Sequence, residues 1–145
     1  MKTDFVDFED VAAERKLSSF GPYERAVDYY GDGSFYLVES PGHMPGHMAA
    51  AIRIAPNSFV FLAADTCHSR QCYSPGKRLI SQAAHADISV ARRTVQWLTR
   101  LNNDYKNVVI ILAHEQERAE EMPLFPGSDL KEWTMGEIER RKRMG

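Results

Sequence analysis

Four short apolar segments, with one amphipathic helix between the last two, constrain what this chain can fold into. The segments are rich in aromatic and β-branched residues, as strands are, and cover residues 34–39, 49–55, 58–64 and 108–112. Asp87 is a good helix N-cap, and apolar residues recur after it at spacings of three and four up to Leu101. A second amphipathic helix is predicted over residues 129–143. These elements predict an α/β fold with layered helices and strands.

The composition is that of a folded chain without a basic surface field. With 145 residues, 43% of them hydrophobic, and no linker or repeat, we expect a single domain over residues 1–145. The formal net charge of −2 argues against nucleic acid and anionic membranes as partners. No apolar run approaches a membrane span, and the acidic start is unlike a secretory signal, so we expect a cytoplasmic protein. Cys67 and Cys72 lack zinc-finger spacing and are predicted to be free thiols.

The loop of residues 40–47, with the sequence Ser-Pro-Gly-His-Met-Pro-Gly-His, follows the first apolar segment. Its two prolines stiffen the backbone around His43, and its two glycines allow backbone angles that other residues avoid. A ligating imidazole needs such a fixed orientation. The loop therefore suits a metal site, although a surface turn with solvated histidines would use the same residue types.

Two further polar residues follow apolar segments. Asp65 comes directly after residues 58–64, and His114 comes shortly after residues 108–112. Strand ends commonly meet at one edge of a sheet, so we expect His43, Asp65 and His114 to lie together. Two imidazoles and a carboxylate suit Zn²⁺ or a similar cation. Taken singly, Asp65 could instead cap a turn, and His114 could be a hydrogen-bonded core histidine.

In combination, these motifs resemble the metallo-β-lactamase superfamily and its lactonase-like hydrolases, most strongly over residues 30–126. The matching motifs are the 40–47 loop, Ala64-Asp65-Thr66, and the run from Ile110 to Glu115, with a tail reaching Leu124-Phe125-Pro126. The resemblance implies the C-terminal half of an αβ/βα sandwich that uses one or two zinc ions. It also implies that His43 ligates one metal, that Asp65 bridges both, and that His114 ligates the second. His47 then corresponds to a histidine that supports the ligands or the loop.

Two histidines stand outside these motifs. His68 lies three residues after Asp65, where lactonase-like relatives can carry a tyrosine facing the substrate. A catalytic histidine there would polarise a carbonyl or protonate a leaving group, whereas a solvated loop histidine would do neither. His85 lies in a polar segment before the helix, and we interpret it as a surface residue.

The superfamily's main metal motif, His-x-His-x-Asp-His, is absent, and no histidine precedes His43. We therefore expect a truncated domain with an exposed apolar sheet face that favours self-association. One functional hypothesis is a zinc-dependent hydrolase acting on a small-molecule lactone or ester. The alternatives are a non-catalytic remnant or gene-model fragment with at most weak metal binding, and part of a glyoxalase II-type thioesterase.

Overall fold

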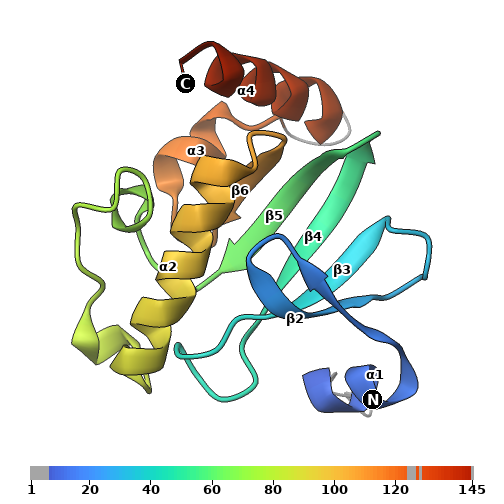
Figure 1. Cartoon of the computed structure of the whole chain (residues 1–145). Coiled ribbons are helices and arrows are strands. Elements are labelled where there is room, and N and C mark those ends of the chain that lie inside the picture. The colour runs from blue at the N-terminus through green and yellow to red at the C-terminus, as the bar shows by residue number, and fades with distance from the viewer. Residues whose placement is uncertain (1–6, 124–126, 128, 145) are drawn as a thin grey trace.

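A computed structural model describes residues 7–123, 127 and 129–144, and it contains a six-stranded mixed sheet (Figure 1). The spatial order of the strands follows the chain, and the first five pair antiparallel with their neighbours. The sixth strand runs parallel to the fifth, because a helix connects the two. The strands are β1 (Leu17–Phe20), β2 (Tyr23–Asp28), β3 (Phe35–Glu39), β4 (Met48–Ala55), β5 (Ser58–Ala64) and β6 (Val108–Leu112).

The strands and helices predicted from the sequence are present, and the α/β fold class is confirmed. The four predicted strands are β3 to β6, each within one residue of its expected bounds. The predicted long helix is α2 (Ile88–Asp104), whose N-cap Asp87 accepts hydrogen bonds from the Ser89 and Val90 amides. The predicted terminal helix is α4 (Leu130–Met144). The predicted tail at residues 124–126 lies outside the described residues.

Several short elements were not predicted: α1 (Phe8–Glu14), β1, β2, the 3₁₀ helices η1 (Arg70–Cys72) and η2 (Gln82–Ala84), and α3 (Gln116–Glu121). Each is too brief to show a clear periodicity, and strands β1 and β2 depend on pairing with each other. Cys67 and Cys72 are buried free thiols, as expected. None of the helices in the described part of the chain is long and apolar enough to cross a bilayer.

One face of the sheet forms the main core under α2. A row of residues aligned across four strands, Tyr36, Ala51, Phe61 and Ile110, points to this face. Leu98 and Leu101 of α2 are fully buried in the same cluster. Each of these leucines stabilises the fold by about 1.5–3 kcal/mol through burial alone. This packing fixes the position of α2 relative to β5 and β6.

The opposite face is covered unevenly. Its central row aligns Val27, Leu37, Ala50, Leu62 and Ile111 across β2 to β6. Val27 is buried under α1, whereas the rest of the row is only half-buried and Leu62 is 37% exposed. An apolar strip is thus open to contact, and the expected self-association through this face stays a prediction.

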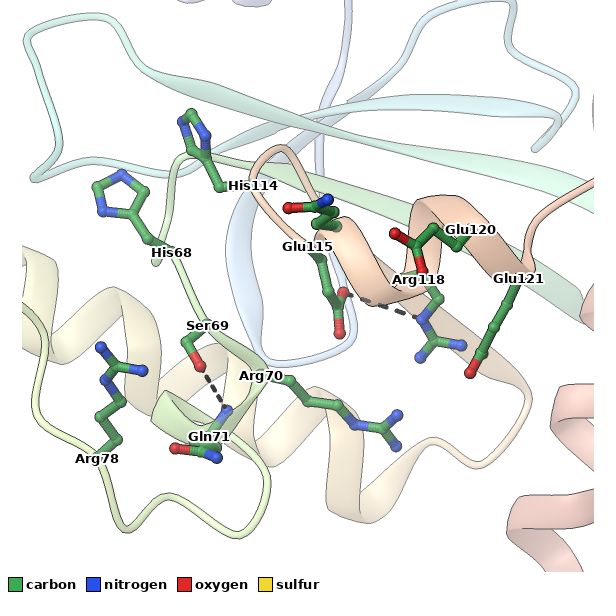
Figure 2. Close-up of a pocket in the computed structure, with 11 residues that line it drawn as sticks. His68, Ser69, Arg70, Gln71, Arg78, His114, Glu115, Arg118, Glu120 and Glu121 are labelled. Atoms are coloured by element: carbon green, nitrogen blue, oxygen red, sulfur yellow. Dashed lines mark hydrogen bonds and ion pairs between the residues drawn. The ribbon is translucent and has the colours of Figure 1, made fainter.

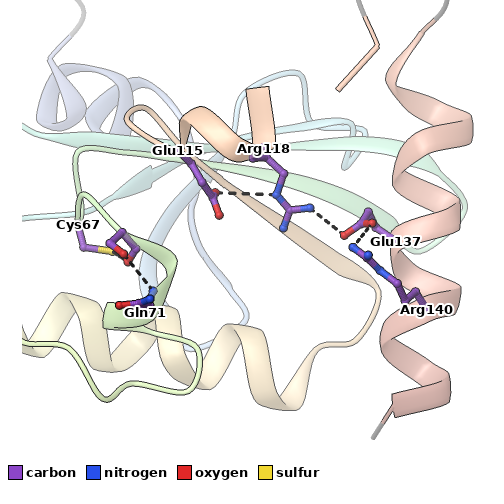
Figure 3. Close-up of polar contacts among 7 residues, drawn as sticks. Cys67, Gln71, Glu115, Arg118, Glu137 and Arg140 are labelled. Carbon is purple, nitrogen blue, oxygen red and sulfur yellow. Dashed lines mark hydrogen bonds and ion pairs between the residues drawn. The ribbon is translucent and has the colours of Figure 1, made fainter. Parts of the chain in front are cut away.

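A buried ion-pair network joins the segment after β6 to α4 (Figure 3). Arg118 of α3 is 5% exposed and donates to Glu137 Oε2 of α4 at 2.8 Å. Glu115 lies 3.9 Å from the same guanidinium, and Arg140 also bonds to Glu137. Buried charges of this kind are tolerated only when paired, so the network requires α3 and α4 to stay together.

The 40–47 loop is fastened to the start of α2. The Gly42 carbonyl accepts a hydrogen bond from the Asp87 amide at 3.0 Å, and the Pro41 carbonyl accepts one from the Thr94 hydroxyl at 2.7 Å. Gly42 has a φ of +117°, and a Cβ on it would lie 2.4 Å from the Ala91 backbone nitrogen. Only glycine fits this close approach.

Gly42→Ala should therefore lower the free energy of unfolding by about 3 kcal/mol, since it adds an overpacked atom and a strained backbone angle. Gly46→Ala is the matched control, because Gly46 has a similar positive φ but open space around it. We expect the control to cost about 1 kcal/mol. Urea denaturation followed by circular dichroism measures both, and equal losses would contradict this account of the loop.

Candidate metal centre

All five histidines of the chain lie in one cluster, although they come from four separate segments. His43 and His47 belong to the 40–47 loop, His68 follows β5, His85 follows η2, and His114 follows β6. The ring centroids lie 5.4 Å apart for His43–His47 and His43–His85, 5.8 Å for His43–His68, 5.7 Å for His68–His85 and 5.0 Å for His68–His114. Such a gathering of imidazoles is typical of a metal-binding region.

The end of β5 places Asp65 through a tight turn. Ala64 adopts a φ of +47°, which is uncommon for alanine, and its carbonyl accepts the Ala113 amide at 3.1 Å. Thr66 closes the turn by donating its amide to the Ala63 carbonyl at 3.1 Å. Because the Ala64–Ala113 bond joins the ends of β5 and β6, Asp65 and His114 lie side by side.

The donor atoms of Asp65, His68 and His114 all lie within 4.8 Å of one another. Asp65 Oδ1 is 2.9 Å from His114 Nε2 and 3.7 Å from His68 Nε2. This carboxylate oxygen is buried but makes no hydrogen bond of good geometry within the described residues. Three donors that converge without satisfying one another, two nitrogens and one oxygen, fit a divalent cation such as zinc.

His47 braces the site. Its Nε2 accepts a hydrogen bond from the Asp65 amide at 3.2 Å, so its Nδ1 carries the proton and donates to the Ser40 carbonyl at 2.6 Å. Burial lowers the pKa of His47, against the opposing effect of the Ser40 bond, and this favours the neutral ring. Because both ring nitrogens are engaged, His47 has no lone pair left for a metal.

His43 lies beside the three converging donors. Its carbonyl accepts the Ala86 amide at 2.9 Å, whereas its Nδ1 is buried without a partner among the described residues. The sequence analysis grouped His43 with Asp65 and His114, but His68 is the histidine whose nitrogen comes close to both. The metal-binding roles of His43, Asp65 and His114, and the catalytic role of His68, stay predictions.

The interpretation of His85 as a surface residue is wrong. His85 is 8% exposed, and neither of its ring nitrogens has a hydrogen-bond partner in the described part of the chain. Burial, followed by the charges of His43 and His68, lowers its pKa. The only sequence signal for this position was its place two residues before the helix cap Asp87, which brings it next to the 40–47 loop.

A polar cavity of about 430 Å³ opens beside His68 and His114 (Figure 2). Its wall carries both charges, from Arg70, Arg78, Arg118, Glu115, Glu120 and Glu121. Arg118 is tied up in the ion-pair network with Glu137, whereas Arg70 and Arg78 have no carboxylate within 4.0 Å among the described residues. A small polar molecule placed here would contact two of the clustered histidines and two available guanidinium groups.

Comparison with known proteins gives partial matches. No family model matches the chain. A cytochrome P450 monooxygenase, mpaDE, of Penicillium roqueforti is 33% identical over 143 residues, covering 83% of this chain and 16% of that protein. The gamma-lactamase FDB1 of Fusarium pseudograminearum is 54% identical over 65 residues, covering 43% of this chain and 14% of that protein. The chain thus spans less than a fifth of the length of these curated relatives.

Among solved structures, an N-acyl homoserine lactone hydrolase with its product bound at the catalytic metal centre matches with a TM-score of 0.53. The match is 23% identical and covers 65% of this chain and 36% of that chain, so it establishes the fold. Relatives named as a metallo-hydrolase and as gamma-lactamases agree with it. The chain belongs to the metallo-β-lactamase superfamily and matches part of the length of its relatives.

Proposed function

We propose that this chain contributes to a zinc-dependent hydrolase that opens a lactone, an ester or a cyclic amide. The observation that carries the proposal is the convergence of Asp65, His68 and His114 beside the 430 Å³ cavity. The gamma-lactamase relatives support a cyclic amide, and the lactone hydrolase of similar fold supports a cyclic ester.

In this proposal Asp65, His68 and His114 hold one zinc ion. Catalytic zinc in proteins normally has three protein ligands and one open position, and one carboxylate with two imidazoles is a known set. When bound, zinc supplies Lewis acidity, which polarises a carbonyl and lowers the pKa of water. His68 is then a ligand and not the proton donor expected from the sequence, because its Nε2 lies 3.7 Å from Asp65 Oδ1.

The cavity supports a role for Arg70 and Arg78 in binding the product side of the reaction. Hydrolysis of a lactone or a lactam adds water across the C–O or C–N bond and leaves a carboxylate and an alcohol or amine. Guanidinium groups bind carboxylates through paired hydrogen bonds. Arg70 and Arg78 line the cavity next to His68, so they would neutralise the new carboxylate.

The first test is zinc affinity. Asp65→Asn and His114→Gln should each remove one bound zinc per chain, since each deletes a ligand from the group of three. Asp104→Asn is the control, because Asp104 is an exposed carboxylate at the end of α2. Elemental analysis after dialysis, with competition against a chromophoric chelator, gives the stoichiometry. Equal zinc content in wild type and both ligand variants would refute this site.

The second test separates a ligand from a catalytic role for His68. If His68 binds zinc, both His68→Gln and His68→Tyr should lose the same equivalent of zinc as Asp65→Asn. Retention of zinc by His68→Tyr, with turnover preserved, would instead support contact with the substrate, as the resemblance implies.

The third test is hydrolysis by the zinc-loaded chain, measured as acid release from a panel of γ-lactones, γ-lactams and aryl esters. We expect a rate above that of Asp65→Asn loaded in the same way, by about 100-fold or more, because the water-activating ligand set is incomplete in the variant. Asp104→Asn should match wild type. A wild-type rate no higher than that of Asp65→Asn would favour the non-catalytic alternative.

A further inference from the structure

His85 is a buried imidazole for which neither the fold nor the proposed zinc site has a use. It is 8% exposed, and both of its ring nitrogens lack hydrogen-bond partners within the described residues. Burying a polar group without a partner is costly, so such a side chain normally has an unseen ligand. The cavity beside it, of about 180 Å³, is also lined by His68 and Ser81.

The backbone holds His85 against the 40–47 loop. The residues that follow it, Ala86 and Asp87, donate their amides to the His43 and Gly42 carbonyls at 2.9 and 3.0 Å. The two segments are thus joined by a pair of backbone hydrogen bonds, one on each side of the Ala86–Asp87 peptide. This arrangement places the His85 and His43 rings next to each other, with centroids 5.4 Å apart and planes at 82°.

The spacing of these two rings fits a shared metal ion. Two imidazoles that bind one tetrahedral zinc at about 2.0–2.1 Å have ring centroids about 5 Å apart. His43 Nδ1 is buried and unpartnered, as are both nitrogens of His85. His47 is equally close to His43, but both of its nitrogens are already hydrogen-bonded. The pair formed by His43 and His85 therefore combines proximity with free donor atoms.

We propose that His43 and His85 hold a second divalent cation of the nitrogen-binding class, such as Zn²⁺, Cu²⁺ or Ni²⁺. The His68 ring, 5.8 Å from His43 and 5.7 Å from His85, closes the third side of this position while its nitrogen serves the first cation. The resemblance assigns a metal to His43, and His85 supplies an imidazole that the resemblance does not assign. The inference rests on the metal-binding part of the proposed function and not on hydrolysis.

The test counts zinc ions in four variants by elemental analysis and chelator competition. Wild type should bind two equivalents per chain, His85→Gln and His43→Gln should each bind one, and His114→Gln should retain the equivalent that the other two lose. Gln82→Ala, an exposed neighbour on η2, is the control and should bind two. Thermal melts of the zinc-free proteins check that each variant folds.

The outcomes separate the two sites. One equivalent in wild type, lost in His114→Gln but kept in His85→Gln, would overturn the second site and leave the proposed function intact. One equivalent lost in His85→Gln but kept in His114→Gln would support the second site and remove the first. Wild type without bound zinc would overturn both.

A measurement on the wild-type chain covers the case in which His85→Gln does not fold. With ¹⁵N-histidine labelling, a zinc titration should shift the ring-nitrogen signals of His43 and His85 together. Signals from His47 should stay in place, because its nitrogens remain hydrogen-bonded. Unshifted His43 and His85 signals at two equivalents of zinc would overturn the inference.

Discussion

The close contact between the 40–47 loop and the start of α2 determines the arrangement of the site. Gly42 approaches Ala91 so closely that no side chain fits between them, and its carbonyl binds the amide of the helix cap Asp87. Because Leu98 and Leu101 fix α2 on the sheet, the hydrophobic core also fixes the loop. The position of His43 is thus an indirect consequence of packing one turn further along the helix.

His47 extends this coupling to the sheet. Its ring bonds to the Ser40 carbonyl on one side and to the Asp65 amide on the other, so it joins the ends of β3 and β5. The turn after β5 holds Ala64 at a positive φ, a strain of about 1–2 kcal/mol that the surrounding hydrogen bonds offset. Strain next to a proposed ligand agrees with the general tendency of functional sites to store it.

The sheet itself is asymmetric. The face under α2 is a complete core, whereas the row of Leu37, Ala50, Leu62 and Ile111 on the other face has partial cover. The metal-binding cluster is attached to the complete side, through α2 and the ends of β5 and β6. The ligand geometry therefore depends mainly on the well-packed half of the molecule.

The sequence by itself determined the regular elements and the edge of the sheet that carries the site. Alternating and continuous apolar runs identified β3 to β6, the spacing after Asp87 identified α2, and polar residues after strands placed Asp65 and His114 together. Such inferences succeed because side-chain periodicity and the shared edge of neighbouring strands follow from local geometry.

Only the tertiary structure decided which histidines approach one another. His68 and His85 lie at either end of an irregular segment without periodicity, whose path depends on the buried Cys72 and Tyr73 and on hydrogen bonds to the 40–47 loop. His85 therefore looked like a surface residue in the sequence, although it is buried against His43. The donor set of a metal site is defined by contacts between residues far apart in the chain, and no local pattern encodes those contacts.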